Sequence, residues 1–414
     1  MSIAYSSQAL DRYSFTATAT TPPVVVATDG VDLVLDDGRR ILDAAGGAVV
    51  TNIGHGRPEV ADAVATALRT IDYVVPIWPT PNRLALVDRL VERWLPEGFN
   101  HVYLAGGGSE AVDTAIRVAR TYHLSRGDER RYKVLGRIPS YHGATITTLG
   151  IGGHMARRAG LDPLMPEYPK VPWNDAGALA AAIEATGPET VAAFIAEPVI
   201  GASAGALVAD VDYWQQVSEI CRQYGILFIA DEVMTGFGRT GLTWGHQHDP
   251  VQPDILVSAK GIGGGYVPMS MVTAADHVLD PISESGRSVM FFTYSGQDAM
   301  CAGALAVLDI MESERLVERT AVMGEKLQTA LRDAVGDHAR VAEVRGRGLM
   351  IGVELVGVSA GEAVAACVDR GMWVYPAGSG PAVNDALLFA PPMVITDEHV
   401  ERIASITLDA LDAL

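Results

Sequence analysis

Two ionisable residues stand where apolar runs of the chain end. Asp231 follows the apolar residues 226–230, and Lys260 follows the mostly apolar residues 254–259. Charged side chains are seldom fully buried without a partner, and open α/β sheets gather functional groups beyond the carboxyl ends of their strands. We therefore expect a carboxylate and an amine at the mouths of two neighbouring buried strands.

Such a pair suits one kind of chemistry. A lysine that burial keeps partly neutral can attack an aldehyde and hold pyridoxal phosphate (PLP) as a Schiff base. A carboxylate nearby can keep the pyridine nitrogen of that cofactor protonated. A plain structural ion pair between Asp231 and Lys260 is the alternative that these two residues leave open.

A glycine turn at residues 106–108 follows a predicted strand and opens a predicted helix. Glycine lets backbone N–H groups approach a phosphate closely, and the helix N-terminus adds partial positive charge. Gly107, Gly108 and Ser109 are therefore candidates for phosphate binding, although a glycine turn with a serine cap would leave the same pattern. The nucleotide-binding motif GxxxxGK[ST] is missing, and Ile351 stands where GxGxxG would need its third glycine.

Three further candidates are aromatic or polar. Tyr141, followed by His142 and Gly143, lies just past a predicted strand, where its ring can stack on a flat cofactor or pack in a turn of its own domain. Glu197 ends an apolar run, so its carboxylate belongs either to a site or to a structural hydrogen-bond network. Thr293 precedes a predicted helix and can contact a phosphate or cap that helix.

The elements that must position these residues alternate along the chain. Short apolar runs are separated by stretches with helical spacing. This alternation is typical of an α/β fold, with a mostly parallel sheet that helices cover on both faces. The predicted strands are residues 101–104, 132–135, 191–196, 226–230, 255–257 and 268–273.

The flanks of this block have a different pattern. They predict an irregular arm at 1–22, a meander at 24–42, and two long helices at about 295–312 and 314–335. The tail predicts strands at 340–344, 350–355 and 372–375 and helices near 360–370 and 396–414. We expect an arm and meander (1–56) that packs with a small α+β domain (311–414), and a large cofactor-binding domain (57–310).

The bulk composition limits the possible partners. The 414 residues, 49% of them hydrophobic, suffice for a large core, and the net charge of −19 argues against nucleic acid or an anionic membrane as the main partner. Three widely spaced cysteines fit a reducing compartment. The first residues lack a signal-peptide pattern, and no apolar run reaches the roughly 18 residues of a membrane span. We expect a cytoplasmic protein that binds small molecules and no metal.

Several segments, in their order, resemble the class III (omega) aminotransferase family of fold-type-I PLP enzymes. The resemblance runs from about residue 43 to 398. The stretches that carry it include "NIGHGRPEV", "GGGSEAVDTAIRVAR", "YHGAT", "FIAEPVIGASAG", "LFIADEVMTGFGRTG", "AKGIGGGYVPMSMV", "FTYSGQDAMCAGALAVL" and "VRGRGLMIGVEL". The family is dimeric or larger, so the resemblance implies a homodimer, or a dimer of dimers, with its site at the subunit interface.

The resemblance also implies roles for individual residues. Lys260 would hold PLP, Asp231 would pair with its ring nitrogen, and Val233 and Tyr141 would pack on opposite faces of the ring. Thr293 would reach the phosphate from the neighbouring subunit. The full set of implied cofactor contacts is Gly107, Gly108, Ser109, Tyr141, His142, Gly143, Glu197, Asp231, Val233, Lys260, Phe292 and Thr293.

The departures from the family concern the substrate. Ala202 and Leu388 stand where members that use glutamate or ornithine carry a glutamate and an arginine, and Pro381 stands near the mobile arginine of amine–pyruvate members. Residues 377–385 include no basic residue. A substrate α-carboxylate normally demands a guanidinium, so another arginine supplies it or the donor lacks a carboxylate. Arg157 and Arg158 are candidates, with solvated surface arginines as the alternative.

The expected substrate pocket is apolar. By alignment with the family, Val49 replaces a large aromatic residue, and Tyr73 and Trp78 lie in a segment that often comes from the partner subunit. These residues favour a hydrophobic or bulky amine or amino acid as donor.

We expect a PLP-dependent aminotransferase that moves an amino group to a keto acid, pyruvate or 2-oxoglutarate. An epimerase, aminomutase or decarboxylase would use the same lysine and aspartate and stays open as an alternative. A non-catalytic binding protein is the alternative from another class, and the intact Asp231–Lys260 pair argues against it.

Overall fold

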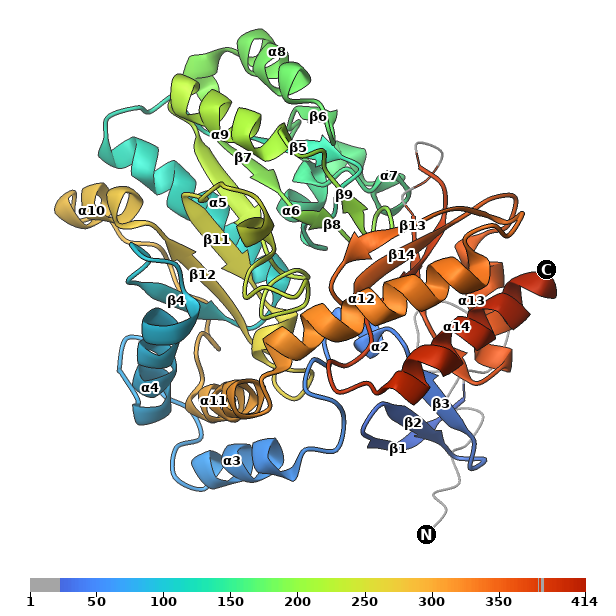
Figure 1. Ribbon diagram of the computed structural model, residues 1–414. Coiled ribbons are helices and arrows are strands. Elements are labelled where there is room, and N and C mark those ends of the chain that lie inside the picture. The colour runs from blue at the N-terminus through green and yellow to red at the C-terminus, as the bar shows by residue number, and fades with distance from the viewer. Residues whose placement is uncertain (1–22, 379, 381–382) are drawn as a thin grey trace.

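The computed structural model describes residues 23–378, 380 and 383–414. The predicted arm at 1–22 and the position of Pro381 lie outside the described residues. Figure 1 shows a large helix-covered sheet beside a group of smaller sheets and the two C-terminal helices.

The large sheet has seven strands in the order β4-β12-β11-β10-β7-β5-β6. β12 runs antiparallel to both of its neighbours, and the other pairs are parallel. The mostly parallel α/β sheet is therefore confirmed, and only the short β6 was not predicted. The strands are β4 (Val102–Ala105), β5 (Lys133–Ile138), β6 (Lys170–Pro172), β7 (Val191–Ala196), β10 (Leu227–Asp231), β11 (Ile255–Ser258) and β12 (Ser270–Ala274).

The strands are continuously apolar because helices cover both faces of the sheet (Figure 1). Alternate residues of β10 show this, since Leu227 and Ile229 pack with α5 (Gly108–Ser125). Phe228 and Ala230 pack with α8 (Ala176–Thr186) and α9 (Tyr213–Tyr224) on the opposite face. Each strand is thereby fixed in its register, and its last residue is held at the edge of the sheet.

Helices also build the base of the molecule. α3 (Pro58–Leu68) and α4 (Pro81–Arg89) pack against α11 (Asp298–Ser313). α11 leads into α12 (Leu316–Val335) through Arg315, which has a left-handed φ of 51°. The predicted pair of long helices is confirmed, with starts two or three residues later than expected.

The smaller sheets join the two ends of the chain. β1 (Val25–Asp29), β2 (Asp32–Leu35) and β3 (Arg40–Asp43) share a sheet with β15 (Met372–Trp373), which runs parallel to β3. A second sheet has the order β13-β14-β17-β16. Its strands are β13 (Val341–Arg347), β14 (Met350–Leu355), β16 (Tyr375–Ala377) and β17 (Ala386–Phe389), beside α13 (Ala360–Asp369) and α14 (Asp397–Asp412). β17 was not predicted.

Two observations concern the expected reducing compartment and the expected lack of a membrane span. All three cysteines are buried free thiols. Among the described residues, no helix combines the length and the apolarity that crossing a membrane requires.

Candidate active site

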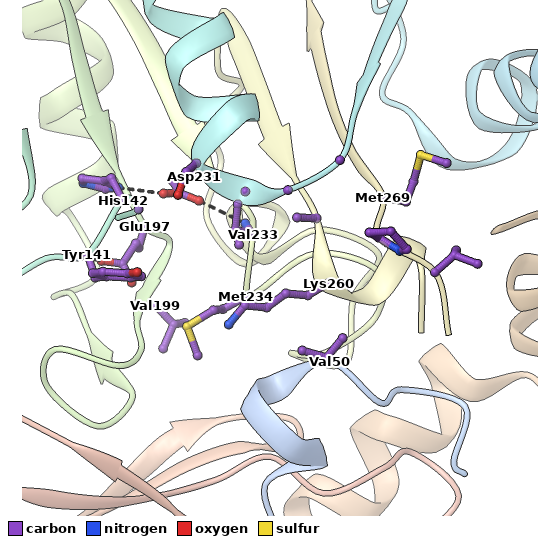
Figure 2. A pocket seen from close by; sticks show the side chains of 18 residues that line it. Val50, Tyr141, His142, Glu197, Val199, Asp231, Val233, Met234, Lys260 and Met269 are labelled. Atoms are coloured by element: carbon purple, nitrogen blue, oxygen red, sulfur yellow. Dashed lines mark hydrogen bonds and ion pairs between the residues drawn. The ribbon is translucent and has the colours of Figure 1, made fainter. Parts of the chain in front are cut away.

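A cavity of about 280 Å³ opens beyond the carboxyl ends of β7, β10 and β11. Figure 2 shows Tyr141, Glu197 and His142 on one side of it and Met269 on the other, with Lys260 reaching between them. Ten of the predicted residues line this cavity, namely Gly107, Gly108, Ser109, Tyr141, His142, Gly143, Glu197, Asp231, Val233 and Lys260.

Asp231 is the last residue of β10 and is 3% exposed. One carboxylate oxygen lies 2.7 Å from Nδ1 of His142, and the other accepts a hydrogen bond of 3.1 Å from the backbone N–H of Val233. Both bonds fix the orientation of the carboxylate. The Nε2 atom of His142 is buried and has no hydrogen-bond partner among the described residues.

Lys260 follows β11 with a left-handed φ of 48°. Non-glycine residues rarely adopt this conformation, and it is a strain that functional sites often contain. The Nζ atom donates a hydrogen bond of 2.8 Å to the backbone carbonyl of Ala48, within the short helix α2 (Gly46–Val49). The lysine amine is thus held at the wall of the cavity by a single neutral acceptor.

The pKa of Lys260 is lowered to about 8, chiefly by burial. The charges of Asp231 and Glu197 oppose this shift, and those of Arg157 and Arg239 contribute to it. A sizeable fraction of the amine is therefore neutral near pH 8, as a nucleophile requires.

Glu197 follows β7 and is 4% exposed. Its carboxylate accepts a hydrogen bond of 2.9 Å from the N–H of Tyr141 and one of 3.0 Å from the N–H of Gly201. Burial raises the pKa of Glu197, and the nearby charge of Asp231 adds to the rise. Glu197 therefore anchors the backbone of Tyr141 and also lies at the cavity.

The N-terminus of α5 forms the far wall. Ser109 Oγ accepts a hydrogen bond of 3.0 Å from the N–H of Ala144. A Cβ at Gly143, where φ is 137°, would lie 2.5 Å from Thr148 Oγ1 and 2.7 Å from Ser109 Oγ, so only glycine fits. A Cβ at Gly108 would lie 3.2 Å from a methyl group of Val233. The first turn of this long helix thus presents close-packed backbone N–H groups, which suit a phosphate.

Four predicted residues lie away from the cavity of the single chain. Phe292 and Thr293 are part of the segment before α11, and the hydroxyl of Tyr73 donates a hydrogen bond of 3.1 Å to the carbonyl of Thr293. Tyr73 and Trp78 are exposed, at 42% and 63%. The structure brings Tyr73 and Thr293 to each other rather than to Lys260.

Val49 and Arg158 also do not line the cavity. Val49 has a φ of 62° and packs into an apolar cluster with Val199 and Met234, while the next residue, Val50, lines the cavity instead. The Arg158 guanidinium donates to the carbonyls of residues 150 and 152 and pairs with Asp162 at 3.0 Å. These bonds direct Arg158 away from the site.

Several lining residues, most of them apolar, were not predicted. Five of them lie next to or within two residues of predicted ones, and the other three lie at the start of the predicted strand 268–273, so the strand ends were the available signal. They are Val50, Gly106, Val199, Met234, Ala259, Val267, Pro268 and Met269.

The fold and the site define a class of protein. A lysine and a histidine-paired aspartate at adjacent strand ends, facing a glycine-rich helix N-terminus, fit the aldehyde, the ring nitrogen and the phosphate of PLP in a fold-type-I enzyme.

Comparison with known proteins identifies the family within that class. The family described as aminotransferase class-III matches residues 15–411, and the chain belongs to it. The chain is 35% identical to the uncharacterized aminotransferase YhxA of Bacillus subtilis (91% of this chain and 89% of the relative). It is 32% identical to the putrescine–pyruvate aminotransferase of Pseudomonas aeruginosa (94% and 90%).

Solved structures agree with this family. The omega transaminase from Pseudomonas jessenii in complex with PMP has a TM-score of 0.92 at 28% identity, over 99% of this chain and 98% of that one. A transaminase from the marine bacterium Virgibacillus has a TM-score of 0.92 at 29% identity, over 98% of both chains. The protein is therefore a PLP-dependent transaminase.

Proposed function

We propose that this transaminase transfers the amino group of a hydrophobic or bulky amine or amino acid to a keto acid, with Lys260 as the covalent attachment point of PLP. The observation that carries the proposal is the lowered pKa of Lys260 in a cavity that also holds the Asp231–His142 pair. When bound, PLP supplies an electron sink for the carbon that loses a proton.

Lys260 has two roles in this proposal. Burial favours its neutral amine, the form that would bind the aldehyde carbon of PLP. The same Nζ, when not bound to PLP, would take the proton from the substrate carbon and deliver it to the cofactor carbon that receives the amino group. In the structure the Lys260 Nζ is held by a hydrogen bond of 2.8 Å to the carbonyl of Ala48, which sets its position in the cavity.

The remaining contacts orient the cofactor. Asp231, hydrogen-bonded to His142, would face the ring nitrogen and help to keep it protonated. Tyr141 and Val233 line the cavity beside the ring position, and the N–H groups at Gly108 and Ser109 face the phosphate. Thr293 completes the phosphate site only from a second subunit.

The donor class rests on the walls of the cavity. Val50, Val199, Met234 and Met269 line it, and Ala202 packs in the cluster behind. Such walls favour an apolar donor because a buried polar group without a partner is costly. Similarity to enzymes named for putrescine and taurine as donors, with pyruvate as acceptor, supports an amine without an α-carboxylate.

A second copy of the chain is part of the proposal. Exposed apolar side chains surround the segment that holds Thr293, including Ile77 at 68%, Met290 at 73% and Tyr294 at 67% exposure. Clusters of exposed apolar residues mark interaction surfaces. A homodimer that covers this patch would bring Thr293 toward the cavity of the partner.

A transfer assay tests the proposed reaction. The purified protein with PLP is incubated with a panel of amines and amino acids, with pyruvate or 2-oxoglutarate, and formation of the new amino acid is measured. Lys260→Ala is the control and should lower turnover at least about 100-fold. Release of CO₂, or deuterium exchange into the donor, without any need for a keto acid would instead support the decarboxylase or epimerase alternative.

A further inference from the structure

A keto acid places a carboxylate next to the carbonyl that receives the amino group. Binding that carboxylate close to Lys260 requires a cation with free N–H groups, and a guanidinium can bind both oxygens at once. The question is which cation near the cavity has donors to spare.

Two other arginines close to the site have their donors engaged. Arg239 is buried and donates to the carbonyls of Leu349 and Pro391 and to the side chain of Asn52. Arg345 pairs with two glutamates and donates to the carbonyls of residues 204 and 205. These two guanidinium groups hold the backbone together and offer little to a substrate.

The histidine whose ring packs against Tyr141 also does not supply a charge. The His154 ring lies edge-on to Tyr141, with 6.2 Å between ring centroids. Burial, with a smaller contribution from the charge of Arg157, lowers the pKa of His154 to about 4. His154 is therefore neutral at physiological pH and forms an uncharged support behind Tyr141.

Arg157 differs from these groups. Its guanidinium carbon lies 4.5 Å from the ring centroid of Tyr141, which lines the cavity. It has one hydrogen bond, of 3.2 Å to the hydroxyl of Tyr375, and no carboxylate partner among residues 23–378, 380 and 383–414. Since a guanidinium has five N–H donors, most of them remain available to a ligand.

The position of Arg157 is set by its neighbours. It belongs to the short helix α7 (Met155–Arg158), which the hydrogen bonds of Arg158 tie to the C-terminal end of α6 (Ile146–Ile151). The backbone of α7 also lies near Gly380, since a Cβ at Gly380 would be 4.0 Å from the N atom of Ala156. The sequence segment 377–385 has no basic residue of its own.

We propose that Arg157, held by Tyr141 and Tyr375, binds the carboxylate of the keto-acid acceptor and of any amino-acid donor. This inference rests on the proposed transamination. The residue that selects keto acids as acceptors would then lie in α7, and not in the segment 377–385. Donors without a carboxylate would leave the Arg157 guanidinium unused.

Two acceptors that differ only in the carboxylate test this role. Pyruvate and acetaldehyde are compared with one amine donor in the wild-type holoenzyme and in Arg157→Gln. Loss of a charged, bidentate hydrogen bond should lower kcat/KM for pyruvate about 10- to 100-fold, mainly through KM. The value for acetaldehyde should change by no more than about 3-fold.

Three further variants sharpen the comparison. Arg130→Gln is the matched control, because it removes an exposed guanidinium that pairs with Glu189 at the surface, and it should leave the pyruvate-to-acetaldehyde ratio unchanged. Arg157→Lys should retain part of the preference for pyruvate over acetaldehyde. Lysine keeps the positive charge but cannot bind both carboxylate oxygens with a planar pair of N–H groups. Tyr375→Phe should lower the ratio by less than Arg157→Gln does, because it removes only one support.

A binding measurement gives a readout without turnover. Propionate should compete with pyruvate in the wild type, with at least about 10-fold weaker inhibition in Arg157→Gln. If the wild type transfers amino groups to both acceptors and the ratio is unchanged in Arg157→Gln, the role of Arg157 is wrong and the proposed function stands. If the wild type uses neither acceptor with any donor, the proposed function fails and this inference fails with it.

Discussion

At the scale of single residues, the site depends on groups whose charge state is set by burial. Lys260 needs a neutral amine, and Asp231 needs an ionised carboxylate within the same cavity. The two side chains have different hydrogen-bond partners. Asp231 contacts the His142 ring and a backbone N–H, whereas the Lys260 amine donates to one backbone carbonyl. The burial of Lys260 therefore favours the neutral amine that the proposed chemistry uses.

The lowered pKa of Lys260 predicts how cofactor capture depends on pH. In protein freed of PLP, the neutral amine fraction rises as the pH passes through about 8 and is complete above that value. The rate of PLP attachment, followed by absorbance after mixing, should rise with a midpoint near pH 8 and then level off. A midpoint close to that of free lysine would show that burial does not tune this amine.

His142 provides a second test at this scale. Its Nδ1 lies 2.7 Å from Asp231, and loss of a hydrogen bond to a buried charge typically costs about 1.5–3 kcal/mol. His142→Asn should therefore weaken PLP binding about 10- to 100-fold, measured by titration of cofactor-free protein. His248→Asn, which alters a histidine bonded to Thr240 instead, should leave the affinity unchanged.

At the scale of elements, the N-terminus of α5 and the turn at Gly143 form one packed unit. Gly143 can approach Ser109 only because it lacks a Cβ. The turn therefore determines where the first N–H groups of α5 point. A change in this backbone would displace the phosphate contacts without touching Lys260.

Gly143→Ala tests this unit. The added methyl would clash with two hydroxyl oxygens and would force a residue with a side chain into a φ of 137°. We expect a loss of about 1–3 kcal/mol in unfolding free energy, together with weaker PLP binding. Gly361→Ala is the control, because the nearest atom to its Cβ would be 4.0 Å away and alanine favours helix α13. An unchanged melting temperature and PLP affinity in Gly143→Ala would contradict the packing argument.

The elements also show what the sequence can and cannot predict. Asp231 and Lys260 were found because long apolar runs mark buried strands, and the ends of such strands converge. β17 was missed because its four apolar residues follow a glycine-rich loop and have no periodicity that distinguishes them. Val49 was predicted where Val50 lines the cavity, since a single left-handed residue decides which of them faces inward.

Contacts between segments far apart in the chain could not be predicted from the sequence for a different reason. Arg157 and Tyr375 meet although they are 218 positions apart, and no local pattern reports on such a pair. The division of the chain at residues 56 and 310 stays a prediction. The sharing of one sheet by β3 and β15 does support packing of the N-terminal meander with the C-terminal part.

At the scale of the whole molecule, the exposed apolar patch around Thr293 predicts the assembly. Trp78, 63% exposed, lies in the same surface region as Tyr73 and Tyr294, whose rings are 5.9 Å apart. A glutamate at position 78 would place a charge in the buried centre of an interface, which is strongly unfavourable.

Trp78→Glu should therefore shift the protein from dimer to monomer and lower activity together with PLP affinity, because Thr293 would no longer reach a partner cavity. Light scattering during size-exclusion chromatography measures the mass. Val211→Glu is the matched control, since Val211 is 85% exposed before α9, and it should stay dimeric. A wild-type protein that is monomeric at micromolar concentration would refute the proposed assembly.

The pairing of β3 with β15 has a consequence for the order in which the chain is made. Every strand of the seven-stranded sheet lies within the first 274 residues to be synthesised. The turn that presents Ala48 to Lys260 is secured by Trp373, whose Nε1 donates a hydrogen bond of 2.9 Å to Gly47 across 326 positions. The strands that carry Asp231 and Lys260 are thus synthesised about 100 residues before Trp373, which holds the turn at Gly47 and Ala48. This side of the cavity can therefore be completed only near the end of translation.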